Sequence, residues 1–130
     1  MRRELLAVLV GGLVGTSLRL AIDGAVPHGD GDFPLSTLII NSVGAFVLGA
    51  LVARLWPVAP GWVKAGIGPG LLGSFTTFSA VAVSLVSLTA TASGMTALAY
   101  LALTLVFGLG AAWLGLSLGG RITPTPEYEE

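Results

Sequence analysis

The sequence contains no cysteine, a single histidine and very few charged residues. Without cysteine, the chain has neither disulfides nor thiolate metal sites. Charged residues make up only 10% of the 130 positions, whereas a soluble domain carries about 25%. No basic stripe is present that would bind a nucleic acid. What remains is an apolar chain, in which 54% of the residues are hydrophobic and the mean hydropathy is +0.90.

Four hydrophobic runs are long enough to cross a bilayer, at roughly 20 residues for each helix. They are expected at residues 5–22, 35–55, 62–88 and 95–118. The sequence therefore predicts an all-α membrane protein with a four-span membrane domain over residues 1–120. The polar tail at residues 121–130 is predicted to be disordered.

Enzyme signatures are missing from the sequence. No carboxylate lies in the predicted spans, so a proton relay or a paired-carboxylate hydrolase has no residues to use. The single histidine, His28, follows the first span in a polar loop beside Asp30, and we interpret it as a solvated loop residue. The chain is therefore not expected to be an enzyme.

The charged residues predict an orientation in the membrane. With four spans, both termini and the loop between the second and third spans face one side. That side carries Arg2, Arg3, Arg54, Lys64 and Arg121. The other side carries Asp23, Asp30 and Asp32, and at most one basic residue, Arg19 at the end of the first span. By the positive-inside rule, both termini are predicted to be cytoplasmic in a multi-pass protein of the cell membrane.

The third span is predicted to be broken near its middle. Residues 66–73 contain Pro69 and four glycines, which are difficult to keep in one regular helix. The next segment, residues 73–79, adds hydroxyl-bearing and aromatic residues, and such irregular backbone at membrane depth must be covered by protein or a water-filled path. The hydroxyls of Thr76, Thr77 and Ser79 would then satisfy freed backbone groups. Alternatively, the carbonyls of Gly73 and Thr76 hold a cation.

Two strongly polar residues lie within the other spans. Arg19 would extend its charge to the membrane surface or bind a helix C-terminus or a phosphate. Asn41, near the middle of the second span, is either a hydrogen-bonding contact between helices or an amide donor that lines the path of an anion.

The fourth span and the break offer further candidates. Thr96, Tyr100 and Thr104 recur every four residues and share one helix face. They either face protein or water, or the threonines bond to their own helix. Phe75 and Phe78 are interpreted as packing residues, although the weakly positive edge of a ring can contact an anion.

Small residues recur four apart in all four spans, and these patterns allow helices to approach closely. They occur at Gly11 and Gly15, Ala45 and Gly49, Gly66 and Gly70, and Ala111, Gly115 and Gly119. The patterns are equally consistent with an oligomer and with packing inside one chain.

Three segments resemble, in order, the motifs of the Fluc (CrcB) family of fluoride channels. Residues 12–19 (GLVGTSLR) are similar to the GxxGxxxR signature, residues 33–44 (FPLSTLIINSVG) to FPxGTLxVNxxG, and residues 70–79 (GLLGSFTTFS) to GxxGGxTTFSTF. The resemblance covers the chain except its tail. It implies an antiparallel dimer with two narrow pores that release cytoplasmic fluoride passively and so lower its toxicity.

The resemblance also implies roles for individual residues. The pore would be lined by Asn41, Phe78, Thr77, Ser79, Tyr100 and Thr104. Arg19 matches the arginine of the first motif, to which we assign a structural role. The carbonyls of Gly73 and Thr76 match the positions that hold a central structural Na⁺ ion.

The chain departs from the family pattern at three positions that affect this reading. Val81 replaces the second phenylalanine, Ser84 an acidic residue and Ser36 a glycine. The missing phenylalanine and the one-sided Lys/Arg distribution favour a heterodimer with an oppositely oriented homologous subunit over a homodimer. A non-conducting or regulatory subunit is the alternative. A small multidrug-type transporter is a further alternative, but it would need a carboxylate in the first span.

Overall fold

The computed structural model describes residues 1–120, which form helices and loops without a strand. The helical segments are α1 (Arg2–Ala25), α2 (Leu35–Arg54), α3 (Gly61–Ala65), the π-helical η1 (Gly66–Leu72), α4 (Gly73–Phe75), α5 (Phe78–Thr91) and α6 (Gly94–Gly120). Segments α3 to α5 follow one another in a single interrupted span, so the described residues contain 4 candidate membrane spans. The predicted four-span, all-α fold with a broken third span is confirmed. The tail predicted to be disordered, residues 121–130, lies outside the described residues.

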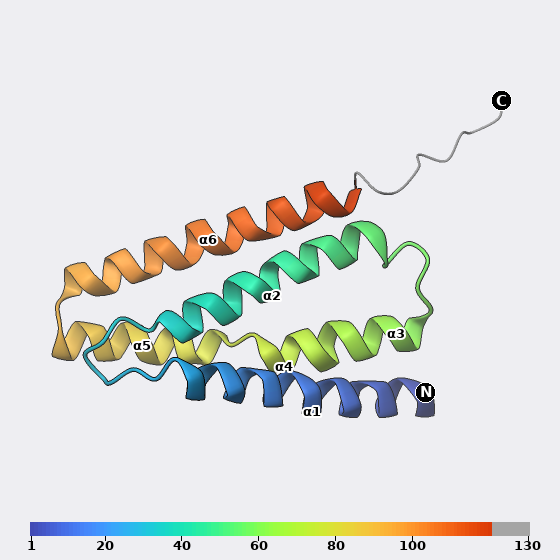
Figure 1. The fold of residues 1–130 in the computed structure, drawn as a ribbon, viewed down its shortest axis with the longest axis horizontal. Coiled ribbons are helices and arrows are strands. Elements are labelled where there is room, and N and C mark those ends of the chain that lie inside the picture. Colours follow the sequence, from blue (N-terminus) through green and yellow to red (C-terminus); the bar gives the residue numbers. More distant parts are fainter. Residues whose placement is uncertain (121–130) are drawn as a thin grey trace.

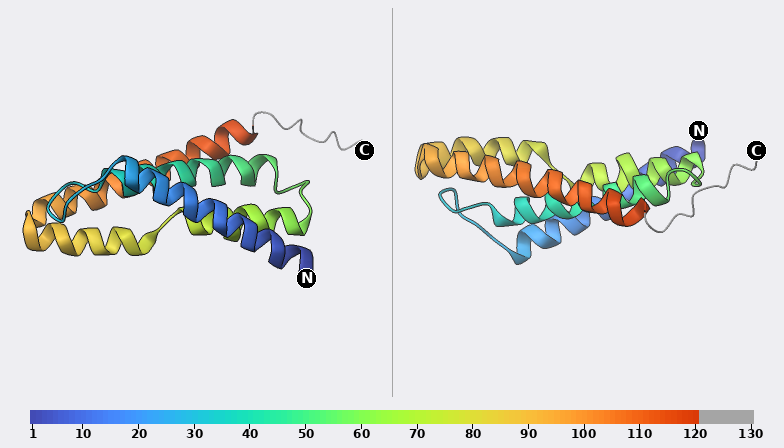
Figure 2. Two further views of the ribbon diagram at one scale, coloured as in Figure 1. Left: turned by 60° about the horizontal axis from the view of Figure 1, so that its bottom comes forward. Right: turned by 90° about the horizontal axis from the view of Figure 1, so that it is seen from above.

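The four spans run lengthwise beside one another (Figure 1). The N-terminus, α3 and the C-terminal ends of α2 and α6 lie at one end of the molecule, and loop one (residues 26–34) and the α5–α6 turn lie at the other. α1 packs on α3, η1 and α4, whereas α2 packs mainly on α6. Figure 2 shows α1 crossing the broken span obliquely. The two halves of the third span thus have different neighbours, because α5 packs on α6.

Glycines bring the paired spans into close contact. A methyl group added to Gly11 or Gly15 of α1 would collide with the backbone of η1, at Gly66 or Leu71. A methyl group on Gly49 of α2 would likewise collide with the backbone of α6. These glycines therefore serve packing within the chain, which is one of the two readings that the sequence left open.

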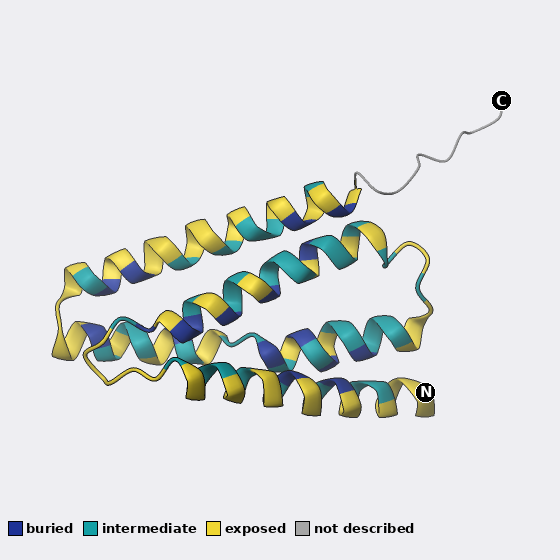
Figure 3. Ribbon diagram, in the orientation of Figure 1, coloured by how far each residue is buried: buried dark blue, intermediate teal, exposed yellow. Residues whose placement is uncertain are grey.

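Much of the surface is apolar and exposed, as a bilayer-facing surface requires. Figure 3 shows exposed residues along the outer side of α6 and of α1. On α6, Leu109 and Trp113 are 71% and 69% exposed. The buried cluster is small and consists of Val81, Leu88, Ala97 and Tyr100, with Phe33, Leu38 and Leu85 against it. Tyr100 is fully buried in this cluster, which brings its polar end into an apolar environment.

Candidate functional site

The third span changes geometry twice. Around Pro69 the helix widens into η1, where the Gly73 N–H donates to the carbonyl of Gly68, five residues back. Proline lacks an N–H and crowds the preceding turn, so a regular helix is unfavourable here. The helix then ends at Thr76 and Thr77, whose ψ angles are 154° and 116°. The predicted interruption is therefore present, with its extended part inside residues 73–79.

Two threonine side chains satisfy backbone groups at this break. The Thr76 hydroxyl donates to the carbonyl of Leu72 at 2.9 Å. The Thr77 hydroxyl accepts from the Ala80 N–H at 3.1 Å and caps the start of α5. It also lies 3.2 Å from the hydroxyl of Ser79. The hydroxyls of this segment are thus largely engaged in holding the break.

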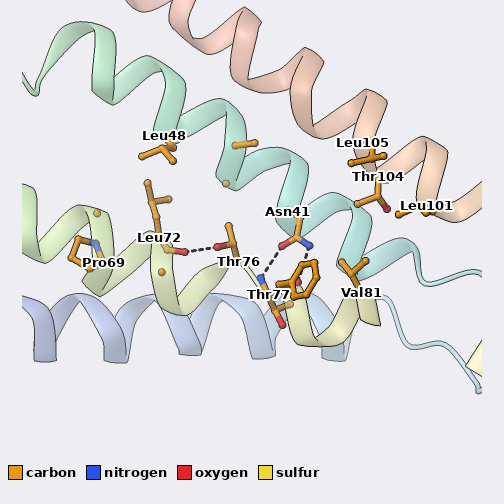
Figure 4. Close-up of a pocket in the computed structure, with 15 residues that line it drawn as sticks. Asn41, Leu48, Pro69, Leu72, Thr76, Thr77, Val81, Leu101, Thr104 and Leu105 are labelled. Atoms are coloured by element: carbon orange, nitrogen blue, oxygen red, sulfur yellow. Dashed lines mark hydrogen bonds between the residues drawn. The ribbon is translucent and has the colours of Figure 1, made fainter. Parts of the chain in front are cut away.

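Asn41 on α2 clamps the extended backbone from the side (Figure 4). Its amide Nδ2 donates to the Thr77 carbonyl at 2.9 Å, and its Oδ1 accepts from the Thr77 N–H at 2.8 Å. Asn41 is therefore a hydrogen-bonding contact between spans. An amide nitrogen carries two hydrogens, and only one of those of Asn41 has a partner among the described residues.

The clamp changes the bonding of Gly73. In a continuous helix the Thr77 N–H would donate to the carbonyl four residues back, that of Gly73. Here that N–H donates to Asn41 instead. The Gly73 carbonyl is consequently left with acceptor capacity at the break, and Gly73 itself is exposed. Hard oxygen acceptors of this kind suit a small cation.

A groove of about 670 Å³ opens beside the break, and it is walled mainly by apolar groups. Figure 4 shows its lining from α2, η1, the break, α5 and α6. Phe78 lies in this groove and is 85% exposed. Val81 also borders it, although its side chain packs into the buried cluster. The groove therefore presents the aromatic ring of Phe78 beside the aliphatic side chain of Val81.

Tyr100 and Thr104 of α6 are the two residues whose buried hydroxyls lack a hydrogen-bond partner among the described residues. The Tyr100 ring meets the ring of Phe33 edge-on, with centroids 5.4 Å apart. The hydroxyls of Ser17 and Thr89, by contrast, donate to carbonyls of their own helices, both at 2.7 Å. The Thr104 hydroxyl does not donate to a carbonyl of its own helix, so two hydroxyls without a hydrogen-bond partner among the described residues, those of Thr104 and Tyr100, lie close together.

The remaining predicted residues lie elsewhere. Ser79 is exposed at the start of α5. Arg19 is half-buried and makes no hydrogen bond or ion pair among the described residues. Two contacts could not be derived from the sequence. The Ser36 hydroxyl donates to Asp23 at 2.9 Å. Ser84 on α5 lies close to the Tyr100 hydroxyl; the sequence distinguishes it only as a departure from the family pattern.

The comparisons with known proteins agree on one family. The model of the family described as CrcB-like protein, Camphor Resistance (CrcB), matches residues 6–116. The chain is 39% identical over 125 residues to the fluoride-specific ion channel FluC of Renibacterium salmoninarum, covering 88% of this chain and 98% of that protein. It is 38% identical over 129 residues to the fluoride-specific ion channel FluC 2 of Halalkalibacterium halodurans, covering 98% and 93%.

Proposed function

Because this chain belongs to the CrcB-like protein family, we propose that it is a membrane subunit of a fluoride channel, through which cytoplasmic fluoride leaves passively. The observation that carries this proposal is the pair of unmet hydroxyls at Tyr100 and Thr104. A fluoride ion loses its hydration shell in a narrow pore, and oriented protein donors can replace that shell. The chain is a channel subunit and not an enzyme.

The groove supplies the other proposed contacts. The free N–H of Asn41 and the ring edge of Phe78 both carry partial positive charge, which suits an anion. Thr77 and Ser79 are assigned to the same path through their position at the break. Arg19, with no partner in the described chain, is assigned to a structural contact with a phosphate or a second subunit.

Fluoride efflux from liposomes tests this function. The chain is reconstituted with fluoride inside, and release is followed with a fluoride electrode, with chloride as the comparison ion. Thr104→Val removes an unmet hydroxyl at nearly constant volume and is expected to reduce efflux about tenfold or more, without loss of stability. The matched control is Thr89→Val, at an exposed hydroxyl that is already satisfied. Equal efflux from both variants would remove Thr104 from the path.

A structural Na⁺ ion at the break is a second part of the proposal. The supporting observation is the Gly73 carbonyl, which the Asn41 clamp deprives of its helical donor. The Thr76 carbonyl follows in extended backbone, and the Thr76 hydroxyl donates to Leu72. The ion would therefore be held by backbone carbonyls, so Thr76→Ser should be mild.

The groove is proposed to be covered by a second, antiparallel subunit, because Phe78 and Gly73 are both exposed there. A heterodimer is favoured. The start of α1, the end of α2 and α3, which lie at one end of the molecule (Figure 1), carry Arg2, Arg3, Arg54 and Lys64. The end of α1 and loop one, at the other end, carry Asp23, Asp30 and Asp32. This imbalance favours one orientation, with both termini cytoplasmic, so an oppositely oriented partner would be a different chain.

Val81 points the same way, since a partner would supply the missing ring. Val81 also supports the second candidate function, a non-conducting subunit. A C-terminal tag that is accessible from one side only, with efflux that requires a co-expressed homologue, is the expected result. Labelling from both sides, with efflux from this chain alone, would instead mean a homodimer of dual topology.

A further inference from the structure

Loop one lies across the end of α5 and is tethered to it. The hydroxyls of Ser87 and Thr91 both donate to the main-chain carbonyl of Asp30. Within the loop, the Gly29 N–H donates to the Asp32 carboxylate at 2.9 Å. The Asp30 carboxylate itself makes no hydrogen bond or ion pair among the described residues. Polar contacts therefore fix where this loop sits, and the Asp30 charge is not needed for that placement.

Two cavities lie beneath the loop. The smaller, about 90 Å³, separates His28, Asp30 and Asp32 of the loop from Ser84 and Ser87 of α5. The larger, about 360 Å³, lies between the helix ends at Asp23 and Thr37 and the face of α5. His28 and Ser84 border both cavities. Because each is larger than the roughly 30 Å³ that one water molecule occupies, both have room for a partly hydrated ion.

Ser84 connects these cavities to the unmet hydroxyls. Its hydroxyl and that of Thr104 both lie near the Tyr100 hydroxyl, yet among residues 1–120 neither Tyr100 nor Thr104 has a partner in hydrogen-bond geometry. Tyr100 is fully buried, so its hydroxyl has no other access to water. A row of hydroxyls therefore leads from the loop-one cavities through Ser84 to Tyr100 and Thr104, inside one chain.

The charges around this row are nearly all negative. Asp23 of α1 and Asp30 and Asp32 of the loop border the cavities, together with the single imidazole of His28. The nearest basic residue in the sequence is Arg19, one helical turn before Asp23. α2 and α5 contribute only uncharged groups to these walls. Such a cluster concentrates cations and makes entry of an anion slower.

We propose that the space beneath loop one is the mouth of the ion path at this end of the chain, with Ser84 as the hydroxyl that passes the anion to Tyr100. The carboxylate of Asp30 lowers the rate at which anions enter there. This proposal rests on the channel function proposed above. It adds an entry that is asymmetric, because Arg2, Arg3, Arg54 and Lys64 belong to segments at the opposite end of the molecule.

Single cysteines test the mouth directly, since the natural chain has none. Ser84→Cys in the full chain, reconstituted in liposomes, is treated with a cationic and an anionic thiol reagent that do not cross membranes. Val86→Cys is the matched control, two residues further along α5 and 71% exposed on the apolar surface. Ser84→Cys should react at least tenfold faster than Val86→Cys, and faster with the cationic reagent. Ala80→Cys, which borders the larger cavity, gives a second position should Ser84→Cys fold poorly.

Adding Asp30→Asn tests the charge without removing a bond, because the main-chain carbonyl of Asp30 makes the contacts. The ratio of cationic to anionic rates should fall by about two- to threefold at ~10 mM salt, and hardly at ~1 M salt. If the cysteines at positions 84 and 80 react no faster than the one at position 86, the proposed mouth is wrong. If Asp30→Asn leaves the ratio of cationic to anionic rates unchanged, the proposed role of Asp30 is wrong.

Fluoride efflux then separates the two proposals. Ser84→Ala should slow efflux, and Ser84→Thr should restore it because the hydroxyl returns. Accessible cysteines in a chain that carries no fluoride, with or without a co-expressed homologue, would contradict the channel function. Normal efflux with inaccessible cysteines would contradict the mouth alone.

Discussion

Replacing Asn41 with alanine should destabilise the fold by about 2 kcal/mol. The change removes both hydrogen bonds to Thr77, of 2.9 and 2.8 Å. Each such bond contributes about 0.5–1.5 kcal/mol net, and membrane side-chain bonds average about 0.6 kcal/mol. The Thr77 N–H and carbonyl are then left without partners at a place that is only partly open, which adds to the loss. The sum corresponds to roughly 30-fold in the folding equilibrium.

The assay is reversible unfolding in mixed micelles, followed by tryptophan fluorescence. Ser42→Ala is the matched control, because Ser42 is the next residue on α2, is equally half-buried, and makes no hydrogen bond among the described residues. Asn41→Ala should lose about 2 kcal/mol and Ser42→Ala less than about 0.5 kcal/mol. If the two variants unfold within about 0.5 kcal/mol of each other, the clamp does not stabilise the break and the reasoning is wrong.

Three further results are expected. Asn41→Asp should block fluoride efflux, because it places negative charge on an anion's path and opposes the Thr77 carbonyl; wild-type efflux would remove Asn41 from the pore. Gly15→Ala should cost about 1–3 kcal/mol in the unfolding assay, since its methyl group meets the Leu71 backbone, whereas Gly108→Ala, with open space around it, should be neutral or slightly stabilising. The methyl group of Gly73→Ala would meet only the Gly68 carbonyl, at 3.7 Å, within the chain, so the monomer should fold normally. A bulkier side chain at Gly73 should prevent Na⁺-dependent assembly. Size-exclusion chromatography in Na⁺ or in a large organic cation measures this assembly.

The four spans could be predicted because each depends only on local composition. About 20 consecutive apolar residues are enough to cross a bilayer, wherever the neighbours lie. The break is also local: Pro69 and its glycines weaken the helix, and the following threonines can bond to their own backbone. The structure follows this reasoning, with a π-helical turn at Pro69 and extended backbone at Thr76 and Thr77.

Contacts between distant segments could not be predicted in the same way. The partner of Asn41 is 36 residues away in the sequence, so residue type alone left both a hydrogen-bonding contact and an anion donor open. Glycine patterns predict close approach but not its partner, and Gly11 and Gly15 turn out to meet η1 of the same chain. Ser84 was noted only as a departure from a family motif, because its nearness to Tyr100 depends on how α5 packs on α6.

In the described chain, some hydroxyl groups in the spans have a hydrogen-bond partner and others have none, and this difference distinguishes structural hydroxyls from candidates for ligand binding. Ser17, Thr76 and Thr89 each donate to a carbonyl four residues back, and such bonds would form in almost any membrane helix. Within the described part of the chain, the Tyr100 and Thr104 hydroxyls have no donor or acceptor in hydrogen-bond geometry, although both are buried. An unmet buried polar group costs about 1–3 kcal/mol, a cost that a ligand would relieve. Of this pair, Thr104 borders the groove. Tyr100 lies close to Ser84. In the proposed channel, a single chain would therefore supply hydroxyls for the anion along its own α5–α6 contact, and a second subunit would close the groove at Phe78.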